Sequence, residues 1–386
     1  MFEPTKSRIR AGPARHNEDL YSWLDRSSRP AAQAARQLIN DWFSHIPTET
    51  TTAHLRGRLE SNDDSQFAAA FWELYLHERI RKLGWNIQTD VPVRDTGLTI
   101  DFLASRPGRR LYLEATSLDQ PKADIAQRRR EAQVYDVLDG LNSPWFFLWA
   151  QKRRTGASQP RLAGLRAKLE RWLNGLDLYR LRAAANSGQI DRLPTYVWRD
   201  GDWEYEFKAL PKFAAAGKSG IRVLGSPGGA QHLVPITAEA IRDAISNKVK
   251  KYGNLDAELV VALMIDSPAH DEEDTADCLY GQSRAYGQSS VILPEGSMLR
   301  DRDGLWSRFE KKRLYGVVVT CQWNPWKVGS VWPLLWLRPG ADHAMGQDLG
   351  FPMRFLAADG VTVNSLPAPQ APHEVFRLPS GWPPRP

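Results

Sequence analysis

Cysteine is nearly absent from this chain, because Cys278 and Cys321 are the only two among 386 residues. A disulfide framework and a cysteine-rich zinc site are therefore excluded. The sequence also has no run of about 18 apolar residues, the length that a membrane span requires. Its first ten residues, MFEPTKSRIR, lack the apolar core of a secretory signal. We therefore expect no membrane association and a cytoplasmic location.

The composition is that of a globular protein with a basic excess. Hydrophobic residues make up 42% of the chain, which is long enough for one large core or two ordinary ones. The net charge is +6, and residues 121–182 hold thirteen Lys and Arg against six Asp and Glu. Such clusters neutralise phosphates, so we expect contact with nucleic acid here, although a solvated helix face at 160–182 is the alternative. The expected contact residues are Arg128, Arg129, Arg130, Lys152, Arg153 and Arg154.

Two acidic residues lie on apolar segments that follow each other closely. Asp101 belongs to LTIDFLAS (98–105) and Glu114 to RLYLEATS (110–117), with Pro107-Gly108 between them. If Pro107-Gly108 is the tip of a hairpin, residues whose numbers add up to 215 lie opposite each other, and Asp101 faces Glu114. Facing carboxylates roughly 5 Å apart repel each other. The pattern therefore predicts a cation between them, and a divalent metal ion is the simplest one.

A third carboxylate precedes this hairpin on a predicted helix. Segment 67–84 has apolar residues around most of its circumference, so the helix should be largely buried. Glu73 and His77 are the only ionisable residues in its first three turns. A buried carboxylate is costly without a partner. We therefore expect Glu73 to pair with His77, to reach water at the helix edge, or to join Asp101 and Glu114 in a metal site.

The order of these features resembles the PD-(D/E)XK nuclease-like superfamily, which has a restriction-endonuclease-like fold. The resemblance covers about residues 62–150. Ile100-Asp101 matches the P-D step, and Glu114-Ala115-Thr116 matches the (D/E)-x-K step. The resemblance implies an α/β protein with a mixed central sheet flanked by helices, and a metal-dependent nuclease site. The expected site residues are Glu73, Asp101, Glu114, Thr116 and a lysine from elsewhere.

The resemblance also implies which residues bind metal. Asp101 and Glu114 would bind Mg²⁺ or Mn²⁺ directly, the carbonyl of Ala115 would add a ligand, and Glu73 would bind a second ion or orient a water. Mg²⁺ prefers carboxylate oxygens, and a bound ion stabilises charge on phosphoryl oxygens and lowers the pKa of water. Phosphodiester hydrolysis requires both effects.

Thr116 stands where the superfamily has a lysine. Segment 235–253 is predicted to be a helix, and Lys248 lies on its apolar stripe. We take Lys248 as the first candidate for the missing lysine and Lys251 as the second. Lys122, just after the third strand, is a local alternative. Lysines near helix C-termini also occur simply because they interact favourably with the helix dipole.

Along the chain we expect a helical N-terminal cap at 1–60, a nuclease-like core at 61–190 and an α/β extension at 191–386. A second hairpin is predicted at 195–210, where Asp200-Gly201 is a turn signal. The apolar segments 258–265 and 316–321 are predicted strands that would extend the core sheet and bring Lys248 near the carboxylates.

Two later segments have unusual compositions. Residues 269–278, AHDEEDTADC, are expected to form an acidic loop. Residues 322–336 hold four tryptophans, which we expect to pack in the core rather than to stack on bases, because exposed indoles promote aggregation. The tail after Leu366 is rich in proline and expected to be extended.

The sequence therefore predicts a metal-dependent nucleic-acid phosphodiesterase, with DNA as the expected substrate. One alternative is a catalytically inactive nuclease-fold module that binds nucleic acid or a protein partner, as Thr116 permits. Another is a hydrolase that uses Asp101 and Glu114 as a metal-free acid/base pair, for example on glycosides. The sequence leaves the oligomeric state open, a homo-oligomer included.

Overall fold

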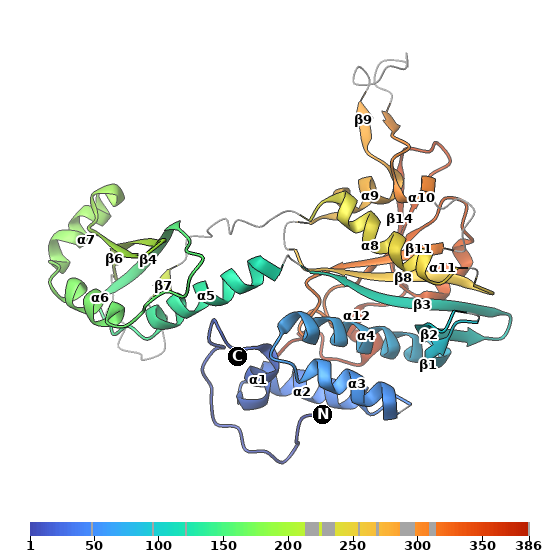
Figure 1. Cartoon of the computed structure of the whole chain (residues 1–386), viewed down its shortest axis with the longest axis horizontal. Helices are drawn as coiled ribbons and strands as arrows, with labels where there is room; N and C mark the ends of the chain where they lie inside the picture. Colours follow the sequence, from blue (N-terminus) through green and yellow to red (C-terminus); the bar gives the residue numbers. More distant parts are fainter. Residues whose placement is uncertain are drawn as a thin grey trace. The chain divides into compact units, whose positions relative to one another are not determined.

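The computed structural model describes residues 1–47, 49–94, 96–119, 122–212, 224–225, 236–253, 255–267, 270–285, 298–308 and 314–384. The chain forms two compact units. Unit 1 comprises Met1–Ala11, Asp19–Gln120 and Val234–Pro386, and unit 2 comprises Gly12–Glu18 and Pro121–Leu233. The protein is thus mixed α/β, and unit 2 is an insertion between two parts of unit 1 (Figure 1). These units do not follow the division at residues 60 and 190 that the sequence suggested.

Unit 1 is built on an eight-stranded mixed sheet with the order β1-β2-β3-β8-β11-β12-β13-β14. Pairing is parallel between β3 and β8, between β8 and β11 and between β12 and β13, and antiparallel elsewhere. The strands are β1 (Asn86–Pro92), β2 (Thr99–Arg106), β3 (Arg109–Leu118), β8 (Glu258–Ile265), β11 (Leu314–Cys321), β12 (Leu334–Leu337), β13 (Met353–Leu356) and β14 (Val363–Leu366).

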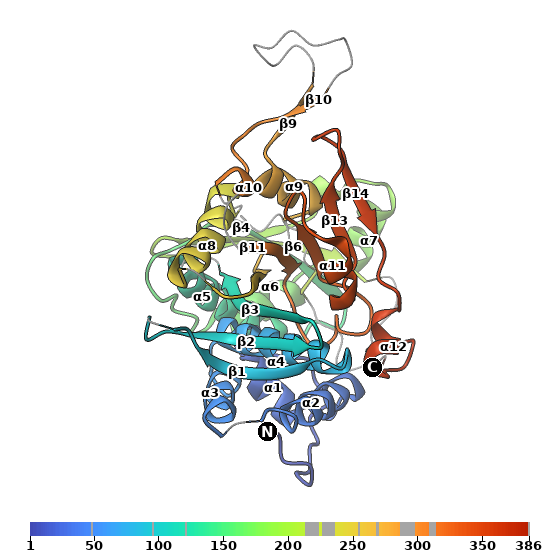
Figure 2. The same cartoon turned by 90° about the vertical axis from the view of Figure 1, so that its right-hand side faces the viewer.

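Helices cover both faces of this sheet. Figures 1 and 2 show α1 to α4 on one side and α8 and α9 on the other. The sheet is therefore buried on both faces, which explains why β8 reads as an unbroken apolar run. The helices of unit 1 are α1 (Leu20–Arg26), α2 (Pro30–Phe43), α3 (Glu49–Leu59), α4 (Asp64–Lys82), α8 (Ala238–Lys251), α9 (Glu272–Tyr280), α10 (Leu305–Arg308), α11 (His343–Leu349) and α12 (Pro372–Phe376).

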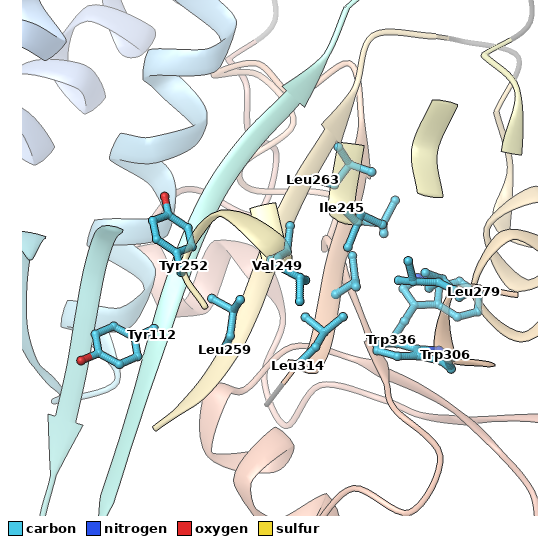
Figure 3. Packing of buried hydrophobic residues seen from close by; sticks show 14 of the residues in the cluster. Tyr112, Ile245, Val249, Tyr252, Leu259, Leu263, Leu279, Trp306, Leu314 and Trp336 are labelled. Atoms are coloured by element: carbon cyan, nitrogen blue, oxygen red, sulfur yellow. The ribbon is translucent and has the colours of Figure 1, made fainter. Parts of the chain in front are cut away.

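The apolar stripe of α8 packs on the central strands. Ile245, Val249 and Tyr252 lie against Leu259 and Leu263 of β8 in one buried cluster (Figure 3). Thr237 caps the helix, since its side chain accepts a hydrogen bond from the backbone of Ala240. These contacts fix which face of α8 is turned to the sheet, and hence where Lys248 lies.

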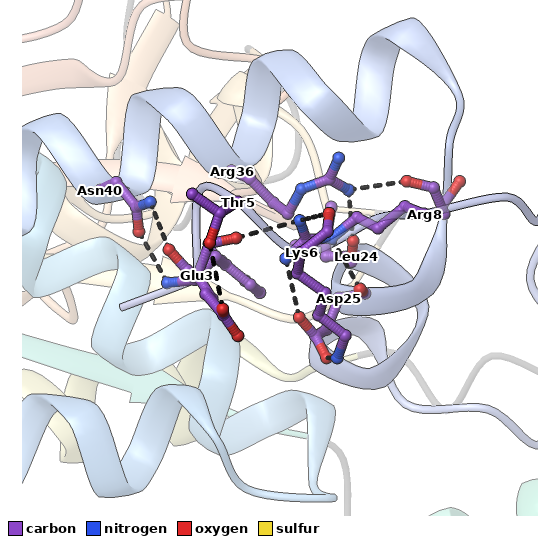
Figure 4. Close-up of polar contacts among 10 residues, drawn as sticks. Glu3, Thr5, Lys6, Arg8, Leu24, Asp25, Arg36 and Asn40 are labelled. Carbon is purple, nitrogen blue, oxygen red and sulfur yellow. Dashed lines mark hydrogen bonds and ion pairs between the residues drawn. The ribbon is translucent and has the colours of Figure 1, made fainter.

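The N-terminal cap is helical, as predicted, and its large apolar side chains are buried: Trp23, Leu24, Leu38, Ile39, Trp42 and Phe43. Polar contacts tie the first residues to α2 (Figure 4). The Asn40 side chain bonds to both backbone groups of Phe2 at 2.7 Å, and Arg36 donates to the carbonyls of Leu24 and Ser27. Beyond Pro47, the polar residues from Glu49 onward belong to α3.

Residues 272–278 of the acidic segment are helical, and the loop prediction was wrong for them. They contribute most of α9, which begins with a capping box between Asp271 and Asp274. Acidic residues in the first turn complement the helix dipole, so this charge pattern favours a helix start rather than a loop. Cys278 and Leu279 are fully buried.

Tryptophans of the 322–336 segment pack inside, as predicted. Trp323 and Trp336 are buried, and the half-buried Trp332 stacks under the Arg79 guanidinium, whose central carbon lies 4.6 Å from the ring centre. The tail beyond Leu366 is not wholly extended, because it contains α12. Among the described helices, none is long and apolar enough to cross a membrane.

Unit 2 has its own small sheet, with the order β5-β6-β4-β7, and its own hydrophobic cluster around Trp203, Tyr205 and Phe207. The predicted turn at Asp200-Gly201 joins β5 to β6. Its elements are α5 (Lys122–Asp139), β4 (Phe146–Arg154), α6 (Leu165–Asn174), α7 (Leu178–Asn186), a 3₁₀ turn (Ile190–Arg192), β5 (Thr195–Asp200), β6 (Trp203–Pro211) and β7 (Leu224–Gly225). Unit 1 also contains a short antiparallel strand pair outside its large sheet, in which β9 (Ser283–Ala285) pairs with β10 (Met298–Arg300).

Candidate functional site

The β2–β3 hairpin has the register expected from its turn. Phe102 pairs with Leu113 and Arg106 with Arg109, and Gly108 takes the positive φ of 74° that the turn requires. One step further along, Asp101 and Glu114 bond to the facing strand through their side chains. The Asp101 N–H donates to Glu114 Oε2 at 3.2 Å, and the Ala115 N–H donates to Asp101 Oδ2 at 2.7 Å. The two carboxylates are thus neighbours, as predicted.

Lys248 reaches this pair from α8. Its Nζ donates to Glu114 Oε1 at 2.7 Å, and the Glu114 side chain is almost completely buried. The contact exists because β3 pairs in parallel with β8, the strand that follows α8 in the chain. The sequence candidate Lys248 therefore lies beside the E-x-T segment.

The second candidate, Lys251, has no direct contact with Asp101 or Glu114 in the described structure. Its Nζ donates to the Tyr252 hydroxyl at 3.0 Å. The side chain of the third candidate, Lys122, lies outside the described residues. Of the two candidates whose side chains are described, Lys248 is the one that contacts the carboxylates.

Glu73 has a hydrogen-bond partner that the sequence did not suggest. Arg58 of α3 donates to Glu73 Oε1 at 2.6 Å, and both side chains are 19% exposed. The expected partner His77 does not bond to Glu73 in the described structure, and its Nδ1 is buried without a hydrogen bond. Burial lowers the pKa of His77 to about 4, so this ring is neutral near pH 7.

A pocket of about 210 Å³ lies beside these groups, although Asp101 and Glu114 are not among its lining residues. Glu73 and Arg58 line it on the helical side, Thr116 and Lys248 line it as well, and the remaining lining residues are Ala69, Trp72, Ala115 and Ser117. All of them belong to unit 1. Thr116, at the position of the superfamily's lysine, thus lines the pocket with a hydroxyl-bearing side chain.

The carboxylates are crowded enough to shift their titration. Burial, together with the Glu114 and Glu73 carboxylates, raises the pKa of Asp101 to about 8. Burial also raises the pKa of Glu73, against the lowering effect of Arg58. Asp101 therefore keeps its proton at neutral pH unless a further cation enters the site.

Two residues of the site were missed from the sequence, Arg58 and Tyr252. The buried ring of Tyr252 lies near Glu114, and burial together with that carboxylate raises the pKa of its hydroxyl. Tyr252 continues the apolar stripe of α8, so its inward direction was readable from helical spacing. Arg58 gave no such signal, because its helix has no clear apolar face and meets α4 only through the fold.

The basic residues expected to contact nucleic acid all belong to unit 2, and those on β4 form ion pairs. Lys152 bonds to Glu131 at 2.8 Å, Arg153 to Glu206 at 3.0 Å and Arg154 to Glu204 at 3.5 Å. Arg128 and Arg129 are exposed on α5, and Arg130 is half-buried. The pairs on β4 lower the local charge that the sequence count suggested.

Other exposed cations of unit 2 lie on its helices. Lys168 and Arg171 of α6 and Arg180 of α7 are exposed, and in the described ranges no carboxylate pairs with them. Unit 2 as a whole holds 20 of the 51 Lys and Arg but only 12 of the 45 Asp and Glu, a net charge of +8. Unit 1 accordingly carries −2. The basic excess of the protein is therefore confined to unit 2.

A second acidic cluster offers metal-ligand atoms, at Asp41, His45 and Glu78, which lie within 4.8 Å of one another. Glu78 is fully buried, but both of its oxygens already accept hydrogen bonds from Arg81 at 2.8 Å, and Lys82 lies 3.7 Å away. These cations already neutralise the carboxylate charge of Glu78 that would bind a metal ion, so the cluster is better explained as an ion-pair network.

No family model, curated protein or solved structure matches this chain. What the structure establishes is a mixed α/β protein with a large mixed sheet flanked by helices.

Proposed function

We propose that the protein is a metal-dependent phosphodiesterase that cleaves nucleic acid, with DNA as the expected substrate, and that unit 1 is a restriction-endonuclease-like core. The observation that carries this proposal is the 2.7 Å contact between Lys248 Nζ and Glu114 Oε1. Through this contact, α8 supplies the lysine that the E-x-T segment lacks and places it next to the Asp101–Glu114 pair.

The donor set fits a divalent cation. Asp101, Glu114 and Glu73 provide carboxylate oxygens, the donors that Mg²⁺ and Mn²⁺ prefer. Among the three, Asp101 is the carboxylate that no described Lys or Arg side chain contacts by a hydrogen bond or ion pair. Burial and the neighbouring Glu114 and Glu73 carboxylates raise the pKa of Asp101 to about 8, so a cation bound there would relieve this repulsion. Asp101 and Glu114, with the carbonyl of Ala115, would hold the ion, which when bound supplies charge stabilisation and an activated water.

The side chains around these ligands have separate tasks. Lys248 holds Glu114 Oε1 and places an ammonium group at the pocket, where it can stabilise negative charge on a phosphate or donate a proton. The Ala115 N–H donates to Asp101 Oδ2 and so holds this carboxylate in place. Thr116 and Ser117 add hydroxyl groups to the pocket wall.

Unit 2 supports a nucleic acid as the partner. Its net charge of +8 is the kind of excess that binds a phosphate backbone with salt-dependent, largely sequence-independent affinity. A cytoplasmic location, in contact with the cell's nucleic acid, completes this proposal.

The second candidate is a catalytically inactive module of the same fold that binds nucleic acid or a protein partner. It is favoured by the two ion pairs of the site, Lys248–Glu114 and Arg58–Glu73, which already neutralise two of the three carboxylates.

Cleavage assays distinguish the two candidates. Purified protein is incubated with single- and double-stranded DNA and RNA in Mg²⁺, Mn²⁺ or EDTA, and calorimetry measures Mn²⁺ binding. We expect cleavage by the wild type with either metal, and neither cleavage nor Mn²⁺ binding by a folded Asp101→Asn variant. Equal Mn²⁺ binding by both proteins would remove the metal site. Nucleic-acid binding without cleavage in any condition would establish the inactive module.

A further inference from the structure

Arg58 is a second cationic side chain in the pocket, and it comes from α3, outside the region that resembles a nuclease. Its guanidinium donates to Glu73 through Nη1 at 2.6 Å. In the described part of the chain its other N–H groups bond to no partner, although Arg58 lines the pocket together with Lys248 and Thr116. A guanidinium that is bonded through one nitrogen in this way keeps its other N–H donors available for a ligand in the pocket.

This placement suits a phosphodiester. A guanidinium matches the two non-bridging oxygens of a phosphate with parallel N–H donors, and such charge-assisted bonds are among the strongest that side chains form. The side chain is only 19% exposed, so Glu73 fixes it before a ligand arrives. The pocket thus offers an anion two cations, Lys248 on the side of Glu114 and Arg58 on the side of Glu73.

The same contact limits how many metal ions the site can take. A divalent cation on Glu73 would lie next to the guanidinium and be repelled by it. Asp101, by contrast, has no cationic side chain bonded to it in the described structure. The charge arrangement therefore favours an ion at Asp101 and Glu114 and disfavours one at Glu73.

We propose that Arg58 binds the scissile phosphate and takes the place of a second metal ion, so that the site holds one divalent cation. This inference rests on the proposed nuclease function and specifies how that site would bind its substrate. It gives Glu73 the task of positioning Arg58, rather than that of a metal ligand.

Mn²⁺ titration calorimetry provides the first test, with Arg56→Gln as the matched control because Arg56 is an exposed arginine two residues away on the same helix. We expect one bound ion per chain for the wild type and for Arg56→Gln. Arg58→Gln should bind a second, weaker ion, because Glu73 is then uncompensated. Two ions in the wild type, or one ion in Arg58→Gln, would overturn the single-ion inference.

Cleavage kinetics provide the second test and separate phosphate binding from simple neutralisation of Glu73. Arg58→Gln should lower kcat/KM about 100-fold or more, and Arg58→Lys should recover only part of it, because lysine keeps the charge but not the fork. Glu73→Gln should retain activity within about tenfold, because Arg58 remains. The double variant Arg58→Gln/Glu73→Gln should stay as slow as Arg58→Gln.

The outcomes distinguish this inference from the function on which it rests. If Arg58 served only to neutralise Glu73, the double variant would regain wild-type cleavage. That result would exclude a role of Arg58 in phosphate binding but would leave the nuclease function supported. Loss of cleavage in Glu73→Gln to the level of Asp101→Asn would likewise make Glu73 a metal ligand. A wild type that neither binds Mn²⁺ nor cleaves would remove both proposals together.

Discussion

At the scale of single residues, the site is governed by which carboxylate has a cationic partner. Glu114 is bonded to Lys248 and Glu73 to Arg58, whereas Asp101 accepts a backbone N–H. Its pKa of about 8, against an ordinary value of 3.8, means that the folded protein binds a proton that the unfolded chain releases. Between these two pH values stability must fall as pH rises, because deprotonation favours the unfolded state.

Asp101→Asn removes this cost. Without divalent cations, the variant should exceed the wild type in free energy of unfolding by on the order of 5 kcal/mol at pH 8, because each unit of the pKa difference corresponds to about 1.4 kcal/mol, and this excess should shrink towards zero near pH 4. Urea unfolding at pH 4, 6 and 8 in EDTA measures it. Asp256→Asn is the control, since Tyr112 and Arg110 lower the pKa of that exposed aspartate, and it should show no gain. A pH-independent difference for Asp101→Asn would show that Asp101 titrates normally.

Lys248 and its neighbours on α8 allow a comparison within one helix. Lys248→Ala should lower cleavage by about two orders of magnitude without a comparable loss of nucleic-acid binding, because it removes a charge next to the reacting groups. Lys251→Ala should be milder, since Lys251 bonds to Tyr252, and Lys250→Ala should resemble the wild type, since Lys250 is exposed. Single-turnover cleavage and binding assays measure the two quantities, and equal losses in all three variants would exclude a specific role for Lys248.

At the scale of elements, strands and helices of unit 2 differ in how their cations are compensated. On β4 each of Lys152, Arg153 and Arg154 faces a glutamate, two of them on the paired strand β6. Cross-strand pairing brings opposite charges together in this way. Lys168 and Arg171 of α6 and Arg180 of α7 have no such partner in the described structure, so these three are the stronger candidates for phosphate contacts.

Salt dependence of binding tests this difference. Replacing Lys168, Arg171 and Arg180 by alanine should reduce the slope of log affinity against log salt by about two to three for double-stranded DNA, because each lost phosphate contact counts about 0.9. The same change at Lys152, Arg153 and Arg154 should have a smaller effect, since their glutamates already neutralise them. Neutralising Arg128, Arg129 and Arg130 should also lower the slope. If all three triple variants kept the wild-type slope, a partner other than nucleic acid would be favoured.

At the scale of the whole molecule, charge and the candidate site are divided between two units with separate hydrophobic cores. The carboxylates, Arg58 and Lys248 belong to unit 1, with a net charge of −2, and the basic excess belongs to unit 2. Ligands that bind only the native form of one unit stabilise that unit by mass action.

Calorimetry should therefore resolve two unfolding transitions that respond to different changes. Mn²⁺ at about 100 times its Kd should stabilise one transition by about 2.7 kcal/mol. Trp203→Ala, in the core of unit 2, should lower only the other one, by about 3–5 kcal/mol. A single transition that both changes shift together would show that the units unfold as one.

The amino-acid sequence by itself determined the features that depend on neighbouring residues. The Pro107-Gly108 turn set the register that joins Asp101 to Glu114, the capped helix α8 placed Lys248 on its apolar side, and the apolar run of β8 marked a strand with the observed bounds. Each follows from a short stretch of chain, because turn geometry and helical spacing are local.

Only the tertiary structure decided which distant side chains meet. Pairing of β3 with β8 across the inserted unit brought Lys248 to Glu114, packing of α3 on α4 brought Arg58 to Glu73, and the β4–β6 pairing neutralised Arg153 and Arg154. The unit boundaries were missed for the same reason. Contacts between residues far apart in sequence depend on how the whole core closes, and no local pattern of charge or hydrophobicity records that.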